Sequence, residues 1–377
     1  MTTRSANRTG GLILTSLLWM TGFSFVASAP YGAHAEQHNP ARAATFGYVA
    51  NTDDNTISVI ATNNTVVATI PVGSRPFGVA TTPDGTHAYV TNSNDNTVSV
   101  IDTARNEVVA TVPVGAFPIG VAVTPDSTLP LQHNDPRHQP HAYVTNSNDK
   151  TVTVIDTANN KVVATIPVGG GPSAVAITPD GTRAYVTNEF DGTFSVIDTA
   201  DNKVVATIPV GAFPTGVAIT PDATHPPEPD DRRHPASAYV TNQLDDTVSV
   251  INTANNTVVA TIPVEVDPAG VAITPDGTRA YVANTAGNDQ TNQFDRTVSV
   301  IDTVRNTVVA TILVGFGPNG VAVTPDGTRA YVTNTIDGTV SVIDTARNKL
   351  VNTIPVGAFP LAVAFATVTP SQPSNEQ

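Results

Sequence analysis

Short apolar runs alternate with polar turns along the chain, and none keeps the spacing of an amphipathic helix. In the copy between residues 318 and 356 the runs are GVAVTPDG, RAYVTN, TVSVID and KLVNTIPV. They are rich in Val, Ile, Thr and Tyr, which favour strands, and are bounded by Gly, Pro, Asn and Asp, which favour turns. The pattern therefore predicts an all-β chain of short strands and tight turns.

These four runs recur together as one unit. The motif Tyr-Val-x-Asn marks the second run of every copy, at Tyr48, Tyr89, Tyr143, Tyr185, Tyr239, Tyr281 and Tyr331. The separations between these tyrosines are 41, 54, 42, 54, 42 and 50 residues, so some copies carry insertions. A base period of about 42 residues is typical of a four-stranded propeller blade. We therefore expect seven blades, each a four-stranded antiparallel meander.

Proline near the end of the fourth run predicts where that strand lies. Because proline cannot donate to a neighbouring strand, the fourth strand belongs on an outer edge. Residues 45–73 supply only the last three strands of a unit, whereas residues 360–367 supply only a first strand, so pairing the two fragments completes one blade and closes the ring. We predict a seven-bladed β-propeller over residues 45–367. The prolines are Pro71, Pro113, Pro167, Pro209, Pro263 and Pro355, with Leu313 in their place in the sixth copy.

The repeated residues resemble a known family. Tyr-Val-Thr-Asn, followed by Asp-Gly-Thr-Val-Ser-Val-Ile-Asp-Thr and by Pro-x-Gly-Val-Ala-x-Thr-Pro-Asp-Gly, is similar to the YVTN-repeat β-propellers of bacterial secreted and archaeal surface-layer proteins. The resemblance covers Thr45 to Thr367 and implies a seven-bladed propeller outside the cytoplasm. It implies no catalytic residues, because the family has no shared catalytic motif. A looser resemblance to propeller lactonases and the cytochrome d1-type propeller rests on fold analogy.

Residues 1–35 have the pattern of a Sec-type signal peptide. Arg4 and Arg8 precede an apolar run, and Ala33-His34-Ala35 forms a small-residue cleavage site. The apolar run is shorter than the ~20 residues of a membrane span. We therefore expect an extracytoplasmic protein, whether periplasmic, cell-surface or secreted. Residues 36–44 are predicted to be a linker and residues 368–377 a disordered tail.

Composition limits the chemistry and the partners. Without the signal peptide the chain has no Cys, Met or Trp, and loss of Arg4 and Arg8 takes its formal charge from −14 to −16. Such an acidic surface repels nucleic acid and anionic membranes. We expect no cofactor, no nucleic acid, no membrane span in the mature chain, and an unidentified protein or glycan partner at the envelope.

One repeated position, the residue before the proline that opens each first strand, varies from blade to blade. We expect the loops containing it to share a face with the turns between second and third strands, where propellers usually bind ligands. The varied side chains then line a central mouth, although they also fit a plugged channel or a tolerant position. The candidate binding residues are Arg75, Phe117, Phe213, Asp267 and Phe359, and the other two copies have Gly171 and Gly317.

Acidic residues recur in the turns between second and third strands. Oxygen ligands of this kind suit Ca²⁺ or another divalent cation. The same acids also fit a purely structural role, because Asp side chains accept hydrogen bonds from nearby backbone in turns. The candidates are Asp54, Asp95, Asp149, Asp191, Asp245, Asp295 and Asp337.

Three insertions interrupt the repeat. Asp126 to Tyr143 and Asp222 to Tyr239 each span 17 residues, against 5 for Asp84 to Tyr89. Both are rich in Pro and His. His133, His138 and His141 are candidate ligands for Zn²⁺ or Ni²⁺, and the alternative is that these insertions are solvated loops without a metal. The third insertion, at residues 285–294, lies on the expected mouth side, where it either covers one side of the mouth or is an Asn-rich loop with no role.

No catalytic motif stands out, since the chain lacks a Gly-x-Ser-x-Gly elbow, a phosphate-binding loop and a His-Glu-x-x-His pair. The sequence therefore favours a non-enzymatic secreted binding scaffold. The alternative is a lactonase-like hydrolase or lyase that uses a divalent cation.

Overall fold

The computed structural model describes residues 43–125, 140–221 and 236–369, apart from residues 286, 289–292 and 295. The chain divides into two compact units, Met1–Pro40 and Ala41–Gln377, and only the second contains described residues. The expected signal peptide, most of the expected linker and all but the first two residues of the expected tail lie outside them. In the described residues, no helix has the length and apolar character needed to cross a membrane.

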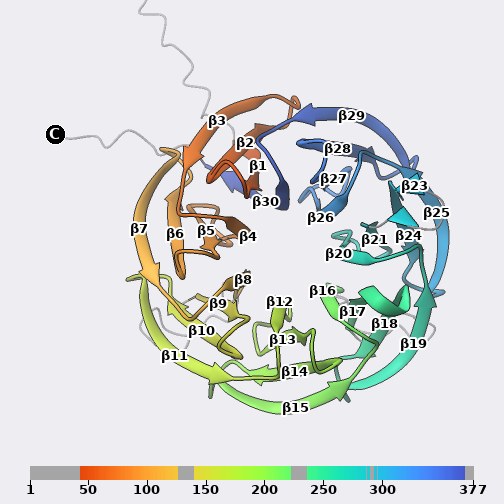
Figure 1. The fold of residues 1–377 in the computed structure, drawn as a ribbon, viewed down its shortest axis with the longest axis horizontal. Coiled ribbons are helices and arrows are strands. Elements are labelled where there is room, and N and C mark those ends of the chain that lie inside the picture. Colours follow the sequence, from red (N-terminus) through yellow and green to blue (C-terminus); the bar gives the residue numbers. More distant parts are fainter. Residues whose placement is uncertain are drawn as a thin grey trace, which may run out of the picture. The chain divides into compact units, whose positions relative to one another are not determined.

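The second unit is a seven-bladed β-propeller with four antiparallel strands in each blade, as the sequence predicts. Figure 1 shows the first strand of each blade near the centre of the ring and the fourth strand at its rim. Blade 1 contains β30 (Pro360–Val368), β1 (Ala44–Asn51), β2 (Thr56–Ala61) and β3 (Val66–Pro71).

Blades 2 to 4 follow in chain order, and each is a simple meander from the inside outwards. Their strands are β4 (Pro76–Thr81), β5 (His87–Asn92), β6 (Thr97–Asp102) and β7 (Glu107–Pro113); β8 (Pro118–Val123), β9 (His141–Asn146), β10 (Thr151–Asp156) and β11 (Lys161–Pro167); and β12 (Pro172–Ile177), β13 (Arg183–Asn188), β14 (Thr193–Asp198) and β15 (Lys203–Pro209).

Blades 5 to 7 repeat this order, and a small hairpin, β22 (Gly287–Asn288) and β23 (Gln293–Phe294), is inserted in blade 6. Gln243–Asp245 forms a single 3-10 turn in blade 5. The strands are β16 (Pro214–Ile219), β17 (Ser237–Asn242), β18 (Thr247–Asn252) and β19 (Thr257–Pro263); β20 (Pro268–Ile273), β21 (Arg279–Asn284), β24 (Thr297–Asp302) and β25 (Thr307–Leu313); and β26 (Pro318–Val323), β27 (Arg329–Asn334), β28 (Thr339–Asp344) and β29 (Lys349–Pro355).

The ring closes through blade 1, where the two ends of the unit pair. Strand β1 lies antiparallel to β30, with Ala44 opposite Val368 and Tyr48 opposite Ala364. This pairing confirms the closure predicted from the fragmentary first and last units, and it extends the predicted propeller by one residue at each end. A closed ring has no unpaired blade at which the sheet packing stops.

Apolar clusters between neighbouring blades form the core. One cluster joins Tyr48 and Ile57 of blade 1 to Ala88, Val90 and Ile101 of blade 2, all fully buried. The innermost strands approach still more closely: a Cβ atom on Gly78 of β4 would lie 2.4 Å from the carbonyl oxygen of Ile119 in β8. Glycine at this position lets the first strands converge around the axis.

A ring of tyrosine hydroxyls also links the blades. Each Tyr of the Tyr-Val-x-Asn motif donates a hydrogen bond to an Asn side chain in the next blade, including Tyr331 of blade 7 to Asn64 of blade 1 (2.8 Å). Each of these asparagines has a positive φ, which Asn tolerates better than most residues. The other pairs are Tyr48–Asn106, Tyr89–Asn160, Tyr143–Asn202, Tyr185–Asn256, Tyr239–Asn306 and Tyr281–Asn348.

Candidate functional site: the mouth face

The loops that lead into each first strand and the turns between second and third strands lie on the same face of the ring, as expected. The backbone N–H of Ser93, in such a turn, donates to the carbonyl of Arg75, in such a loop (2.9 Å), and Ser147 does the same to Phe117 (3.0 Å). We call this face, made of the loops at residues 72–75, 114–117, 168–171, 210–213, 264–267, 314–317 and 356–359 with the turns beside them, the mouth face.

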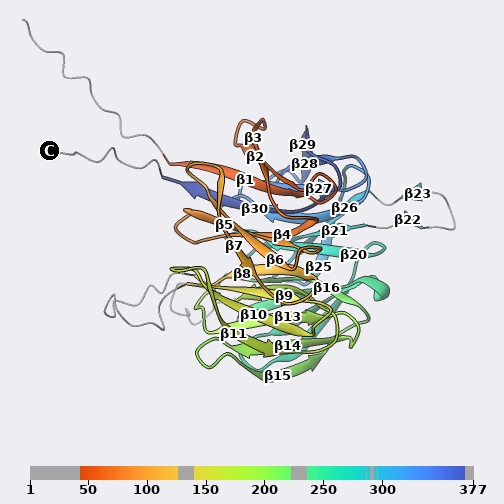
Figure 2. The same cartoon turned by 60° about the vertical axis from the view of Figure 1, so that its left-hand side comes forward.

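The hairpin of β22 and β23 belongs to one of these turns. Figure 2 shows it projecting from blade 6. The sequence suggested either a cover on one side of the mouth or a loop without a role, and the structure adds that part of the insertion forms paired strands, with Gly287 opposite Phe294.

The recurrent carboxylates of the mouth face bind backbone. Asp95 Oδ2 accepts a hydrogen bond from the N–H of Ser74 in the adjoining loop (2.6 Å), and Asp54 accepts one from Ala358 (2.6 Å) across the closure of the ring. Such charge-assisted bonds hold each loop to its turn. Asp295 lies outside the described residues. In the same way Asp149 accepts from the N–H of Ala116, Asp191 from Gly170, Asp245 from Ala212 and Asp337 from Phe316, at 2.6–2.8 Å.

All five candidate binding residues occupy the left-handed region of the backbone. Residues before proline normally adopt extended conformations, and side chains other than Gly or Asn rarely have a positive φ. At this position the repeat imposes a strained backbone in every blade, and only Gly171 and Gly317 relieve it. The φ angles are 55° for Arg75, 56° for Phe117, 55° for Phe213, 53° for Asp267 and 54° for Phe359.

Hydrogen bonds from the preceding blade hold this strained backbone in place. The N–H of Arg75 donates to Asn55 Oδ1 (2.8 Å), and that of Phe117 donates to Asn96 Oδ1 (2.9 Å). Because the carbonyl groups of Arg75 and Phe117 also accept a bond from the adjoining turn, both backbone groups are satisfied without help from the side chain. The fold therefore fixes the backbone here and leaves the side chain available to vary.

A second variable position on the mouth face escaped the sequence analysis. It lies two residues after Tyr-Val-x-Asn, where blades 1 to 3 have the polar residues Asp53, Asn94 and Asn148. Blades 4, 5 and 7 have large apolar residues there, and these are strongly exposed: Phe190 (68%), Leu244 (68%) and Ile336 (61%). Comparing the seven copies column by column would have revealed this change from polar to apolar.

One candidate residue, Phe213, meets one of the newly found residues, Phe190, on the mouth face. The rings of Phe190 and Phe213 lie 6.1 Å apart, centre to centre, in a tilted arrangement. Phe359 is 39% exposed, and the guanidinium of Arg296 lies 4.4 Å from the centre of the Phe316 ring. Exposed aromatic and aliphatic side chains that gather on one face are typical of a binding surface.

Two carboxyl groups of the mouth face have environments unlike the rest. Glu189 stands directly after Tyr-Val-x-Asn, where the other copies have Ser, Thr or Gln. Burial raises the pKa of Glu189, and a hydrogen bond from Ser173 offsets part of that rise. Burial and the nearby charge of Asp246 also raise the pKa of Asp267. The sequence named Asp267 as a candidate, with a charge opposite to that of Arg75, but did not single out Glu189.

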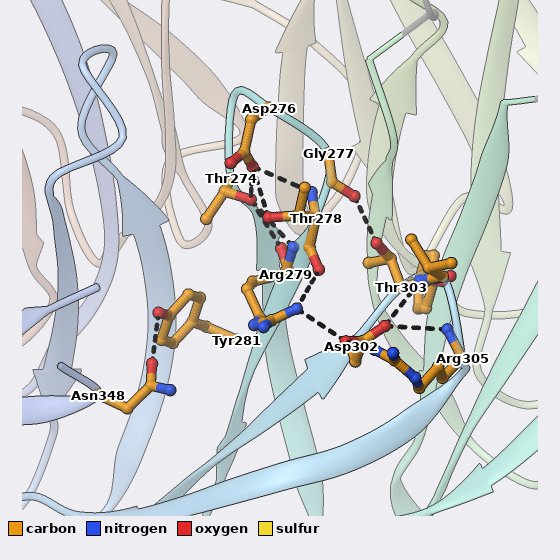
Figure 3. Close-up of polar contacts among 12 residues, drawn as sticks. Thr274, Asp276, Gly277, Thr278, Arg279, Tyr281, Asp302, Thr303, Arg305 and Asn348 are labelled. Carbon is orange, nitrogen blue, oxygen red and sulfur yellow. Dashed lines mark hydrogen bonds and ion pairs between the residues drawn. The ribbon is translucent and has the colours of Figure 1, made fainter. Parts of the chain in front are cut away.

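On the opposite face, the polar side chains of the repeated turns are engaged in hydrogen bonds and ion pairs with one another and with nearby backbone (Figure 3). Asp276 Oδ1 accepts hydrogen bonds from the Thr274 hydroxyl and the Thr278 N–H, and Gly277 takes the positive φ (71°) expected of the Thr-Pro-Asp-Gly turn. Nearby, Arg279 and Arg305 each bond Asp302 Oδ2 at 3.0 Å. Burial acts to raise the pKa of Asp302, but its hydrogen bonds and the two arginines outweigh burial and lower it.

No group of three or more His, Cys, Asp or Glu side chains suited to a metal occurs within the described ranges. His133 and His138 lie outside those ranges. His141 is the first residue of β9, and its backbone N–H donates to Thr124 Oγ1 (2.9 Å) beside the turn between first and second strands. This histidine therefore lies on the face opposite the mouth.

Comparisons with known proteins support the fold. A family model described as a YNCE-like β-propeller matches residues 132–227. No curated protein sequence matches the chain. Similar solved structures include Kuenenia stuttgartiensis hydrazine synthase, with 24% identity and a TM-score of 0.63 over 79% of this chain and 92% of that chain.

Two further solved structures have the same fold. A protein of unknown function from Desulfotomaculum acetoxidans has 19% identity and a TM-score of 0.68, covering 85% of this chain and 99% of that chain. The dihydro-heme d1 dehydrogenase NirN, in complex with DHE, has 18% identity and a TM-score of 0.61, covering 85% and 74%. At such identities the likeness shows the propeller fold alone.

Proposed function

We propose that this chain is a secreted, non-enzymatic β-propeller of the YVTN-repeat type, whose mouth face binds a protein or glycan at the cell envelope or outside the cell. The proposal rests on one observation above all. Large side chains, several of them exposed, depart from the repeat at two positions of the mouth face, whereas the hydrogen bonds that hold these loops recur from blade to blade.

The strained backbone adds support. A non-glycine residue with a positive φ before proline costs on the order of 1 kcal/mol or more. Five blades keep such residues although glycine occurs at the same position in the other two. Strain of this kind is retained where the side chain does something that glycine cannot, and contact with a partner is the simplest such role for an exposed loop.

No described residue favours the alternative of a cation-dependent hydrolase. Within the described residues no three His, Cys, Asp or Glu side chains come together as a metal site, and the recurrent carboxylates of the mouth face each hold a neighbouring loop through a backbone N–H. We therefore retain the binding scaffold as the proposed function.

The test compares three forms of the protein on envelope material. In the mouth variant, Phe190→Asn, Leu244→Asn and Ile336→Asn install the residue type found in blades 2 and 3; in the control, Val109→Thr and Val163→Thr change exposed residues at the rim. Each form, carrying a cross-linker, is applied to envelope protein and to a glycan array. We expect the mouth variant to lose at least ~10-fold in affinity for a partner that the control still binds. Equal binding by both variants contradicts the proposal.

A further inference from the structure

The outer strand of blade 6 lacks the protection that the other outer strands share. All seven outer strands are described. Each of them, β25 included, has a register shift beside the third strand of its blade, such as that between Val300 and Ile301, so this feature does not set β25 apart. Six of them end in proline, but β25 ends at Leu313, which is 60% exposed. Proline and charged residues are the usual means by which a sheet edge avoids pairing with another chain.

Blade 5 offers a natural comparison. Strand β19 reads TVVATIP and β25 reads TVVATIL, so the two uncharged strands differ only in their last residue. Their exposed valines are also alike, with Val258 at 41% and Val259 at 54% in β19 against Val308 at 38% and Val309 at 48% in β25. The exchange of proline for leucine therefore isolates one feature of the edge.

That feature is an outward-pointing N–H. In β25 the N–H of Val314, just past the strand, donates inward to the carbonyl of Arg296 (2.6 Å). Because backbone groups of an antiparallel strand point alternately to either side, the N–H and carbonyl groups of Leu313 and Thr311 point away from β24. A proline at the corresponding position removes one of these donors in the other six blades. Among the seven outer strands, only β25 keeps the outward-pointing N–H of its last residue.

We propose that β25 pairs with β25 of a second copy of this chain, antiparallel and in one register. A two-fold axis at Ile312 sets Thr311 opposite the second copy's Leu313, and Leu313 opposite its Thr311. Each facing pair then exchanges both of its N–H···O bonds, and a proline at 313 would remove one bond from each pair. A two-fold contact of this kind is self-complementary and stops at the dimer.

A second copy suits this edge because the strand is uncharged. The chain has a net charge of −14, so most surfaces of two copies repel each other, whereas β25 brings no like charges together. Leu313 and Thr311 project on the same side of the sheet and add apolar contact to the backbone bonds. The contact is short, so the dimer is expected to be weak, with a dissociation constant between about 10 μM and about 1 mM.

Sedimentation equilibrium of the full propeller over this concentration range tests the proposal. We expect the average mass of the wild-type protein, 39.0 kDa for a monomer with all 377 residues, to rise towards twice the monomer mass. Leu313→Pro restores the residue of the other blades and should raise the dissociation constant at least ~10-fold without changing the thermal unfolding midpoint. Leu313→Ala keeps the N–H and should still dimerise. Adding Pro263→Leu to Leu313→Pro should restore association through β19.

A cross-linking experiment tests the register. Since the chain has no cysteine, single variants Thr311→Cys and Leu313→Cys report without background. Mixed together and oxidised, they should form a disulfide heterodimer, because facing residues bring their Cα atoms within disulfide range. Either variant alone should cross-link far more slowly.

A wild-type mass that stays monomeric at every concentration overturns the proposal, even where an extended peptide from another protein binds β25. Association that Leu313→Pro leaves unchanged overturns it as well. Neither result bears on the mouth face, which lies on loops that β25 does not include.

Discussion

At the residue scale, hydrogen bonds between neighbouring blades explain why certain residues recur in every copy of the repeat, and one copy alone does not reveal these bonds. The tyrosine of Tyr-Val-x-Asn is recognisable in the sequence as a strand residue, but its hydroxyl bonds an asparagine 58 to 71 residues further along, in the next blade, and 267 residues earlier for Tyr331. Its partner was predictable only as part of a turn. The pairing depends on how blades stack, which local patterns do not encode.

Removal of one such hydroxyl should measure the strength of the link between blades. Tyr143→Phe deletes the bond to Asn202 (2.7 Å) and leaves the half-buried acceptor without it, so we expect a loss of about 1 kcal/mol in the free energy of unfolding by urea. Tyr48→Phe is the matched control, because its bond to Asn106 is long (3.4 Å) and its loss should be smaller. Equal losses would show that the hydroxyl contributes through packing instead.

The same tyrosines should make the fold sensitive to base. Burial, with a smaller effect of Asp102, raises the pKa of Tyr48 to about 12, and burial raises that of Tyr281 to about 12 as well. The unfolded phenol ionises near pH ~10. Below that pH both states hold the proton; above it the unfolded state loses its proton first, so stability falls as pH rises from about 10 to about 12.

Urea unfolding across this range, with phenolate absorbance followed in parallel, measures the effect. The free energy of unfolding should be flat at neutral pH and fall steeply above pH ~10. Native phenols that ionise with ordinary pKa values, with no loss of stability, would contradict the burial that the structure assigns to them.

At the scale of strands and loops, much was predictable and the exceptions are informative. The strands, the proline-bearing rim, the glycine turns and the closure through β1 and β30 all follow from residue periodicity and turn chemistry. The apolar positions at Phe190, Leu244 and Ile336 were not predicted, since they were treated as part of an ordinary turn. Their significance depends on exposure, which requires the folded ring.

A departure within the second strands predicts a stabilising change. In β17 the Thr241 hydroxyl accepts from the Gly216 N–H (2.8 Å) and donates to the Ala269 carbonyl of the next blade (2.6 Å). Blade 6 has Ala283 at the position of Thr241. Its Gly270 lies as close to the Asn319 carbonyl of blade 7 as Gly216 lies to the Ala269 carbonyl, so the same bond acceptor is at hand. Ala283→Thr should therefore raise the free energy of unfolding by about 1 kcal/mol.

Ala283→Val, which introduces a side chain isosteric with threonine, controls for volume in that experiment. It adds similar bulk without a hydroxyl, so it should be less stable than Ala283→Thr in the same denaturant titration. Valine and threonine variants of equal stability would mean that the bridging bonds contribute nothing at this site.

At the scale of the whole molecule, stability depends on closing the ring. Strand β30 pairs with β1 along most of its length and contributes Val363 and Ala366 to the apolar clusters on both sides of blade 1. Truncation after residue 359 should open the ring, expose both clusters and abolish the cooperative thermal transition. Truncation after residue 369, which keeps β30, should leave the unfolding midpoint unchanged. A cooperative transition in the shorter chain would contradict closure as the source of stability.

Hydrogen exchange of the complex with a partner recovered from the envelope tests binding by the mouth face most directly. Exchange should slow in the loops before each first strand and in the turns that carry Phe190, Leu244 and Ile336, while the Thr-Pro-Asp-Gly turns of the opposite face exchange as in the unbound protein. Protection confined to those opposite turns, or to the rim, would contradict the account.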